Sequence, residues 1–132
     1  MRLFTLEEAR ALLPELLPLL EELRQAVLRL RAIEAARSAA ARGATADGHD
    51  LEPPFAVTPA DPAEGPIETV RLASRVLQEH GVELKDPAQG LIDFPHLRDG
   101  RTVYLCFRLG EPTIQYWHEL HTGFAGRRPL DS

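Results

Sequence analysis

Apolar residues recur every three or four positions along the N-terminal third of the chain, which is the spacing of one face of an α-helix. The main seam consists of Leu6, Ala9, Leu13, Leu16, Leu20, Leu23, Val27 and Leu30. A second apolar stripe runs beside it through Leu12, Leu19, Ala26 and Ile33, so the apolar face is wider than a single partner helix requires. We therefore expect one long helix over residues 1–42 that contacts two neighbours.

Local signals predict where this helix begins and how it bends. Thr5 followed by Glu8 forms a capping box, in which each side chain accepts a hydrogen bond from the backbone N–H of the other residue. Pro14 and Pro18 each remove an intrahelical hydrogen bond, but both fall on the outward side of the seam. Because a proline on the outer side bends a helix without entering its packed face, we expect one kinked helix rather than two.

Residues 43–65 are rich in proline and glycine and carry no apolar period, which predicts a flexible linker. A second helix is predicted over residues 66–80, because Pro66 suits a first helical position and Gly81 suits a helix end. Its apolar side chains are Ile67, Val70, Ala73 and Leu77. Two helices that follow one another through a linker indicate an antiparallel pair.

From residue 82 onward the apolar period changes from helical to alternating, which is typical of β-strands. Four segments show this alternation, and they are "VELKDP", "GLIDFP", "RTVYLCFRL" and "TIQYWHEL". They are rich in β-branched and aromatic residues, as strands commonly are. We expect an antiparallel sheet over residues 82–119, followed by a C-terminal tail over residues 120–132.

Asp99-Gly100 lies between two of these strands and is a strong signal for a two-residue hairpin turn. Such a turn pairs Phe94 with Leu105 and Ile92 with Phe107. One face of the sheet then consists of Ile92, Phe94, Val103, Leu105, Phe107 and Leu109. The other face carries Asp93, Tyr104, Cys106 and Arg108. The predicted fold class is α+β, with a long kinked N-terminal helix and a second helix in an antiparallel pair packed on a small antiparallel β-sheet.

Composition narrows the classes of protein to which the chain can belong. Its 132 residues fit a single domain that can bury its own core. Twenty acidic residues against fifteen basic ones give a net charge of −5, so nucleic acid is not an expected partner. One cysteine, no signal-peptide pattern and no apolar run of about 20 residues predict a cytoplasmic protein without a membrane partner.

Several segments resemble one known family, and they occur in the same order along the chain. They are "FTLEEARALLPEL", "GVELKD", "GLIDFP", "DGRTVYLCFRLGEPTIQYWHE" and "GFAGRRPL". On these motifs the chain resembles the bacterial domain-of-unknown-function family 2203 over nearly its whole length outside the linker. The resemblance implies a bacterial, cytosolic protein, and it carries over no catalytic residue, substrate or cofactor.

A metal site is one candidate for the polar face of the sheet. His118 and His121 lie three positions apart in "WHELH", but Thr122 stands where a zinc-protease helix needs its second histidine. The two histidines could share a metal with Asp93 and Cys106, since carboxylate, thiolate and imidazole groups all bind transition metals. A structural or surface role for the histidines is the simpler alternative.

The face on which His118 lies depends on the turn after residue 109. A two-residue turn opposes His118 to Val103 on the apolar face, whereas a three-residue loop pairs it with Tyr104 on the polar face. Pro112 cannot donate a hydrogen bond to a strand neighbour, which favours the longer loop.

A small-ligand site is a second candidate for the same face. Its residues are Asp93, Arg108, Glu111, His118 and Arg127. In the simpler interpretation, Asp93 and Arg108 form a cross-strand ion pair. Cys106 could act as a nucleophile if a neighbouring cation lowered its pKa, but a buried thiol in a strand is the default interpretation.

The C-terminal tail contains glycines that allow it to turn back over the sheet. We expect Phe124 to anchor it there, and Arg127 to reach a carboxylate such as Asp93 or Glu111. An anion-binding pocket around Arg127-Arg128 is the functional alternative.

The breadth of the leucine face carries the functional hypothesis. We expect a non-enzymatic homodimeric interaction or regulatory module, in which that face pairs with a second chain. The predicted interface residues are Leu13, Leu16, Leu20, Leu23, Val27 and Leu30. An unidentified protein partner is a further expectation, and a small-ligand or metal-binding protein with its site on the polar face is the alternative. The sequence identifies no cofactor and no catalytic residue.

Overall fold

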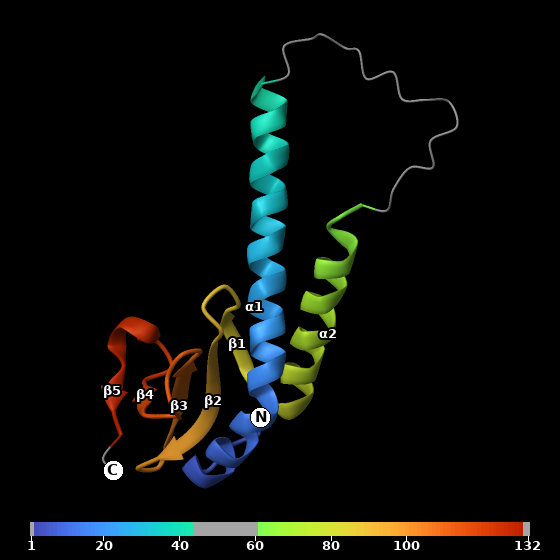
Figure 1. Ribbon diagram of the computed structural model, residues 1–132. Coiled ribbons are helices and arrows are strands. Elements are labelled where there is room, and N and C mark those ends of the chain that lie inside the picture. Colours follow the sequence, from blue (N-terminus) through green and yellow to red (C-terminus); the bar gives the residue numbers. More distant parts are fainter. Residues whose placement is uncertain (1, 44–60, 131–132) are drawn as a thin grey trace.

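The computed structural model describes residues 2–43 and 61–130. Its helices are α1 (Leu6–Gly43) and α2 (Glu64–His80), and a short 3-10 helix, η1, spans Phe124–Gly126. Its strands are β1 (Glu83–Asp86), β2 (Leu91–Arg98), β3 (Arg101–Arg108), β4 (Tyr116–His118) and β5 (Arg128–Pro129). The strands pair antiparallel in the order β1-β2-β3-β4-β5, with α1 and α2 side by side next to the sheet (Figure 1). The predicted α+β fold class is confirmed.

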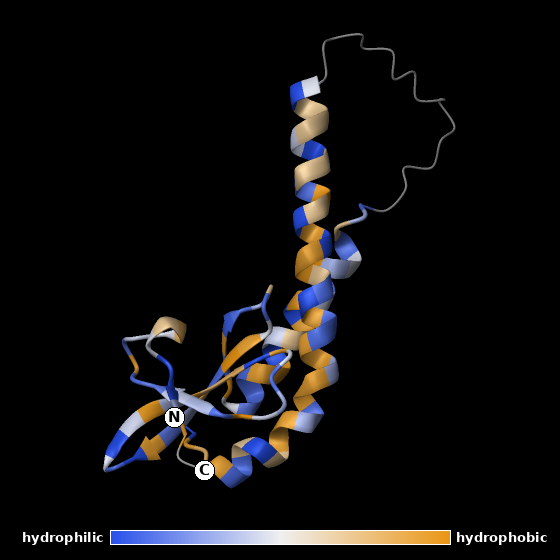
Figure 2. Cartoon of the chain, turned by 60° about the vertical axis from the view of Figure 1, so that its left-hand side comes forward, coloured by the Kyte–Doolittle hydropathy of each residue, from blue (hydrophilic) through white to orange (hydrophobic). Residues whose placement is uncertain are grey.

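Helix α1 forms as its local signals predict. The Thr5 N–H donates to Glu8 Oε1 and the Glu8 N–H donates to Thr5 Oγ1, each at 3.0 Å, which is the reciprocal capping box. The helix continues without a break through Pro14 and Pro18, and both prolines are exposed. Its first turns lie at an angle to the rest in Figures 1 and 2, so the prolines bend the helix outside its packed face.

The hydrophobic core lies where α1, α2 and the apolar face of the sheet meet. It contains Phe4, Ala9, Leu13, Leu16, Leu20, Leu23, Ala73, Leu77, Val82, Ile92, Phe94, Val103, Leu105, Phe107, Ile114 and Trp117. In Figure 2 the apolar colour is strong along the lower part of α1 and on the neighbouring strands, and it fades toward the free end of α1. The two neighbours expected for the seam are therefore α2 and the sheet of the same chain.

This core corrects the predicted placement of the dimer residues. Leu13, Leu16, Leu20 and Leu23 are buried in the chain's own core, so these four leucines offer no surface to a second chain. Sequence periodicity identified the apolar face but could not say which chain covers it. Val27 and Leu30, the last two predicted interface residues, remain partly exposed.

The second helix begins slightly earlier than expected. Its first residue is Glu64 rather than Pro66, and Gly81 ends it in a left-handed conformation with φ 81°. Ala73 and Leu77 are buried as predicted, whereas Ile67 is 46% exposed because the start of α2 lies beyond the sheet. Most of the predicted linker over residues 43–65 lies outside the described residues.

The central hairpin has the predicted turn and register. Asp99 and Gly100 have φ values of 51° and 78°, the left-handed pair that a tight two-residue turn requires. Phe94 pairs with Leu105, and Ile92 pairs with Phe107. Both predicted pairings are confirmed.

The C-terminal third differs from expectation in its details. The fourth strand is shorter than "TIQYWHEL" and spans only Tyr116–His118, although Tyr104 pairs with His118 as the longer-loop alternative requires. The tail contributes η1 and β5, which were not predicted, and β5 pairs with β4 at the edge of the sheet. Neither helix of the described part of the chain combines the length and apolarity that crossing a membrane would require.

Candidate functional site

A cluster of three polar side chains is buried on the polar face of the sheet. Asp93 on β2 is 1% exposed, Cys106 on β3 is 0% exposed and His118 on β4 is 2% exposed. Asp93 and Cys106 are direct cross-strand partners, and their ligand atoms and that of His118 all lie within 4.8 Å of one another. The strand register thus brings together three residues that are far apart in sequence. The sequence placed Asp93 and Cys106 on one face and left the face of His118 open between two turn lengths, and it did not predict that this face is closed to solvent.

Two hydrogen bonds hold the His118 ring. Its Nδ1 lies 2.7 Å from the Glu119 carbonyl oxygen, and its Nε2 lies 2.9 Å from Asp93 Oδ2. A carbonyl oxygen only accepts, so we assign the Nδ1 hydrogen to that bond. The Nε2 contact with the carboxylate then requires one more proton, held between Nε2 and Oδ2. Burial raises the pKa of Asp93, and the His118 charge opposes that rise.

The second carboxylate oxygen of Asp93, Oδ1, does not share the hydrogen bond that Oδ2 makes with His118. Within the described part of the chain, Asp93 Oδ1 is buried and makes no hydrogen bond. Buried polar atoms are nearly always paired, because leaving one unpaired costs desolvation energy without compensation. The Cys106 thiol, a weak S–H donor, interacts with the Asp93 carboxylate and opposes the rise that burial causes in the pKa of Asp93, but no donor in the described part of the chain makes a hydrogen bond of normal geometry to Oδ1.

The Cys106 thiol is held in its protonated form. Burial, followed by the negative charge of Asp93, raises the pKa of Cys106 to about 12. This environment does not favour the nucleophile that the sequence left open, because a reactive thiol needs a lowered pKa and access.

Strand β1 adds a polar edge to the cluster. The Tyr104 hydroxyl donates to Glu83 Oε2 at 2.7 Å, and the Tyr104 ring lies 5.4 Å from the His118 ring. Burial, together with the bond to Glu83, raises the pKa of Tyr104 to about 12. Lys85 bonds Glu83 at 3.0 Å and sits 4.7 Å from the centre of the Tyr104 ring. Sequence analysis did not single out Glu83 and Lys85, although their alternation in "VELKDP" places them on one side of that strand.

A second polar pair joins Arg127 of the C-terminal tail to Glu111 in the loop after β3. Arg127 Nη2 donates to Glu111 Oε1 at 2.7 Å and to Oε2 at 2.6 Å, with both side chains nearly buried. The Arg127 guanidinium also lies 3.9 Å from the centre of the Tyr116 ring and 4.5 Å from that of Phe124. Of the two predicted carboxylate partners of Arg127, the structure selects Glu111 over Asp93.

Two predicted members of the site lie elsewhere. Arg108 does not pair with Asp93, since its guanidinium packs over the Phe124 ring at 5.1 Å while Asp93 bonds His118. His121 is exposed and does not belong to the group of ligand atoms found among the described residues. The predicted ligand set therefore divides into an Asp93–His118 pair and a Glu111–Arg127 pair with Arg108 beside Phe124.

A different surface lies between α1 and α2, beyond the sheet. Val27 and Leu30 help to line a groove of about 390 Å³, which we call the helix groove. Its apolar lining is completed by Ile33, Ala63 and Ile67, and its charged lining consists of Arg31, Glu34 and Arg37. Arg37 forms an ion pair with Asp61, which ties α1 to the segment that precedes α2.

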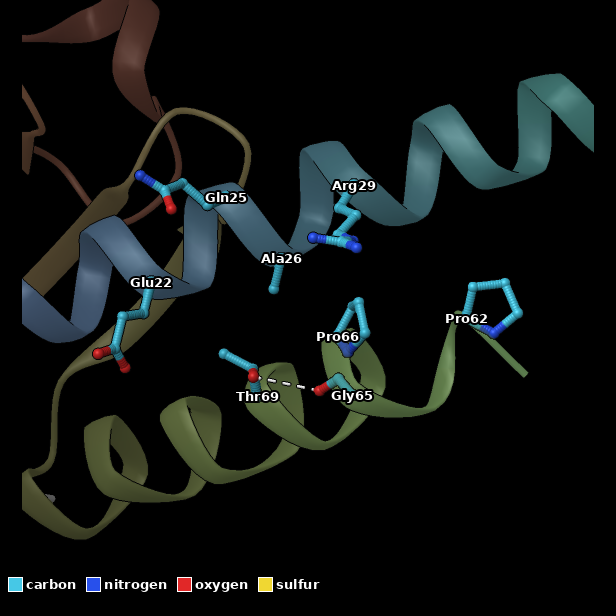
Figure 3. A pocket seen from close by; sticks show the side chains of 8 residues that line it. All are labelled: Glu22, Gln25, Ala26, Arg29, Pro62, Gly65, Pro66 and Thr69. Atoms are coloured by element: carbon cyan, nitrogen blue, oxygen red, sulfur yellow. Dashed lines mark hydrogen bonds between the residues drawn. The ribbon is translucent and has the colours of Figure 1, made fainter. Parts of the chain in front are cut away.

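A larger hollow of about 930 Å³ lies between the same two helices (Figure 3). Glu22, Gln25 and Arg29 approach it from α1, while Pro66 and Thr69 approach it from α2. The Thr69 hydroxyl donates to the Gly65 carbonyl of its own helix at 3.1 Å. Glu22, Gln25 and Arg29 are exposed, so the hollow lacks the desolvated polar groups typical of a small-molecule pocket.

Comparison with known proteins gives one match. The family model described as "Uncharacterized conserved protein (DUF2203)" matches residues 2–130. No curated protein and no solved structure gives a significant match.

Proposed function

The chain belongs to the DUF2203 family of uncharacterised conserved proteins, and we propose that it is a non-enzymatic homodimeric interaction module whose second copy packs on the helix groove. The observation that carries this proposal is the apolar lining of that groove. Val27, Leu30 and Ile33 line it from α1, and Ile67 lines it from α2 while remaining 46% exposed. Apolar residues from two elements that converge on one exposed groove are typical of an interaction surface.

The length of α1 supports a partner at this position. A helix of 38 residues extends about 57 Å, whereas the 17 residues of α2 extend only about 26 Å. Figures 1 and 2 both show the C-terminal end of α1 extending past the first turn of α2 and away from the sheet. A protruding helix gains most of its stability from packing of its apolar side, so contact with a second copy would stabilise this end of α1.

The charges that line the groove favour an antiparallel pair. Arg31 and Glu34 both line it, and Ile33 lies between them. A two-fold axis beside Ile33 would place Arg31 against the partner's Glu34, and Glu34 against the partner's Arg31. A parallel pair would instead place the arginines of the two helices side by side, which electrostatic repulsion disfavours. The proposed interface keeps Val27 and Leu30 of the original prediction and replaces the buried leucines by Ile33 and Ile67.

The mass of the purified chain in solution tests this proposal. Light scattering coupled to gel filtration should give the mass of two chains for the wild type and that of one chain for the Ile33→Glu, Ile67→Glu double variant. Leu72→Glu is the matched control, because Leu72 is 48% exposed on α2 and does not line the groove. Circular dichroism should show that all three proteins are folded. A wild type that stays a monomer at high concentration would refute the proposal.

A charge exchange tests the antiparallel arrangement separately. Arg31→Glu and Glu34→Arg should each weaken the dimer, because each places like charges together across the two-fold axis. The double variant should recover most of the lost affinity, since the reciprocal pairs are restored with opposite polarity. Additive weakening in the double variant would rule out this register.

A further inference from the structure

The buried cluster on the sheet has the chemistry of a metal site. Asp93, Cys106 and His118 offer a carboxylate oxygen, a thiol sulfur and an imidazole nitrogen, and each comes from a different strand. These are the three donor types that zinc accepts. Tetrahedral zinc keeps its ligand atoms roughly 3.5 Å apart. The three atoms already lie within 4.8 Å of one another, so side-chain adjustments of about 1 Å would complete the site.

The His118 ring is oriented as a metal-binding histidine would be. Its Nδ1 faces the Glu119 carbonyl at 2.7 Å, and its Nε2 points toward Asp93 and the interior of the cluster. A histidine that ligates a metal through one nitrogen commonly donates its other N–H to a carbonyl, because that bond holds the ring and directs the free lone pair at the ion. The Nε2 lone pair and the Asp93 carboxylate therefore converge on one point, which a cation can occupy in place of the shared proton.

Asp93 Oδ1, which has at most the weak S–H donor of Cys106 beside it, provides independent support. Asp93 is 1% exposed, and its Oδ1 has no hydrogen-bond partner within the described part of the chain. Strand β3 lies between β2 and β4, so the bond from Asp93 to His118 passes over β3, where Cys106 is the direct cross-strand neighbour of Asp93. A cation between these three residues would satisfy an acceptor that is otherwise buried at a cost.

The net charge of the buried cluster stays the same when a divalent cation replaces two protons. Without metal, the thiol is neutral, and the Asp93–His118 pair with its shared proton has no net charge. Binding of a divalent cation would release the thiol proton and the shared proton, leaving one thiolate, one carboxylate and a neutral imidazole around the ion. The total remains zero, so no uncompensated charge is placed in the sheet. A thiol that coordinates a metal is deprotonated even where its free pKa is high, and its proton is released to solvent.

We propose that Asp93, Cys106 and His118 bind one zinc ion, with a buried water molecule in the fourth coordination position. The mixed sulfur, nitrogen and oxygen donor set favours zinc over magnesium or calcium, which prefer oxygen ligands alone. This site is separate from the helix groove, so each proposal can fail without the other.

Metal titration of the full-length chain tests the site. The chain is stripped with a chelator, dialysed, and titrated with cobalt(II), which substitutes for zinc and reports its ligands by absorption. A single equivalent should saturate the site and produce a thiolate-to-cobalt charge-transfer band, and added zinc should abolish that band by displacing the cobalt. Zinc should also raise the unfolding temperature of the wild type.

Two variants at proposed ligands and one control test the assignment. Cys106→Ala should remove the charge-transfer band, and Asp93→Asn should lower the affinity by about 100-fold or more, since it removes a charged ligand. His121→Ala is the control, because His121 is exposed, and it should leave affinity and spectrum unchanged. A variant that misfolds would be recognised by circular dichroism before metal is added, and Asp93→Asn preserves the side-chain shape as a second probe. Absence of one-to-one binding, or a band that survives Cys106→Ala, would overturn the proposal.

Discussion

Asp93 on β2 and His118 on β4 are joined by a 2.9 Å hydrogen bond that crosses the intervening strand β3. Both side chains are buried, and they belong to strands that do not pair with each other directly. The bond therefore connects two non-adjacent strands on the face of the sheet that points away from the main core. The polar face therefore contributes to the integrity of the sheet.

Removal of Asp93 should destabilise the metal-free protein strongly. Asp93→Ala leaves the His118 ring buried without its partner, and breaking a buried pair costs about 3 kcal/mol or more. Urea unfolding at neutral pH measures this loss. Glu68→Ala is the comparison, because Glu68 forms an exposed ion pair with Arg71 and should cost less than about 0.5 kcal/mol. Equal losses in the two variants would contradict the assigned role of the Asp93–His118 bond.

The Cys106 thiol should react very slowly while the protein is folded. Its pKa is raised from 9.0 to about 12, so the fraction of thiolate near neutral pH falls by about 1000-fold even before access is considered. Alkylation by iodoacetamide, followed by mass spectrometry, should show little modification in buffer and rapid modification in denaturant. Rapid labelling of the native chain, with no sign of unfolding, would show that the thiol is not held as described.

Substitution by alanine should lower the stability of the protein at Gly100, in the hairpin turn, and raise it at Gly65, in α2. Gly100→Ala should cost about 1 kcal/mol, because φ 78° in the hairpin turn disfavours any side chain. Gly65→Ala should stabilise the protein by about 0.5 to 1 kcal/mol, because Gly65 lies in α2 and an added Cβ meets no atom within 4 Å. Thermal unfolding of both variants measures the difference, and a shift of the same sign in both would contradict the assigned backbone conformations.

Glu8 should show the signature of the capping box in its acid titration. Hydrogen bonds from the Thr5 backbone and side chain, in that order, lower its pKa below 4.5. A carboxyl whose pKa is lower in the folded state stabilises that state above pH 4.5 and loses this effect as the pH falls through the folded pKa. The stability difference between wild type and Glu8→Gln should therefore be present at neutral pH and vanish in acid. In an NMR titration, Thr5→Val should move the pKa of Glu8 only part of the way back toward 4.5, because the substitution removes the side-chain bond and keeps the backbone bond.

Local interactions made much of the fold accessible to prediction. The capping box uses residues three positions apart, and the helical seam repeats within each two turns of α1. The register of the central hairpin follows from Asp99-Gly100, because a two-residue turn leaves the flanking strands only one tight pairing. Alternation in those strands then determines which side chains share a face, so Asp93 and Cys106 could be placed together without coordinates.

The sequence did not predict which segments cover each face of the helix and of the sheet, because this depends on contacts between distant parts of the chain. Periodicity marked Leu16 and Leu23 as apolar, but packing against the sheet and α2 decided that the chain covers them itself. The two-residue strand β5 contains Pro129, has no local signal, and forms because the tail reaches the edge of β4. The cluster of Asp93, Cys106 and His118 is closed to solvent for the same reason. The direction in which a side chain points is set by the local backbone, so the sequence predicts it. Whether that side chain is buried depends on which distant segments pack against it, and this packing is determined by the free energy of the whole fold.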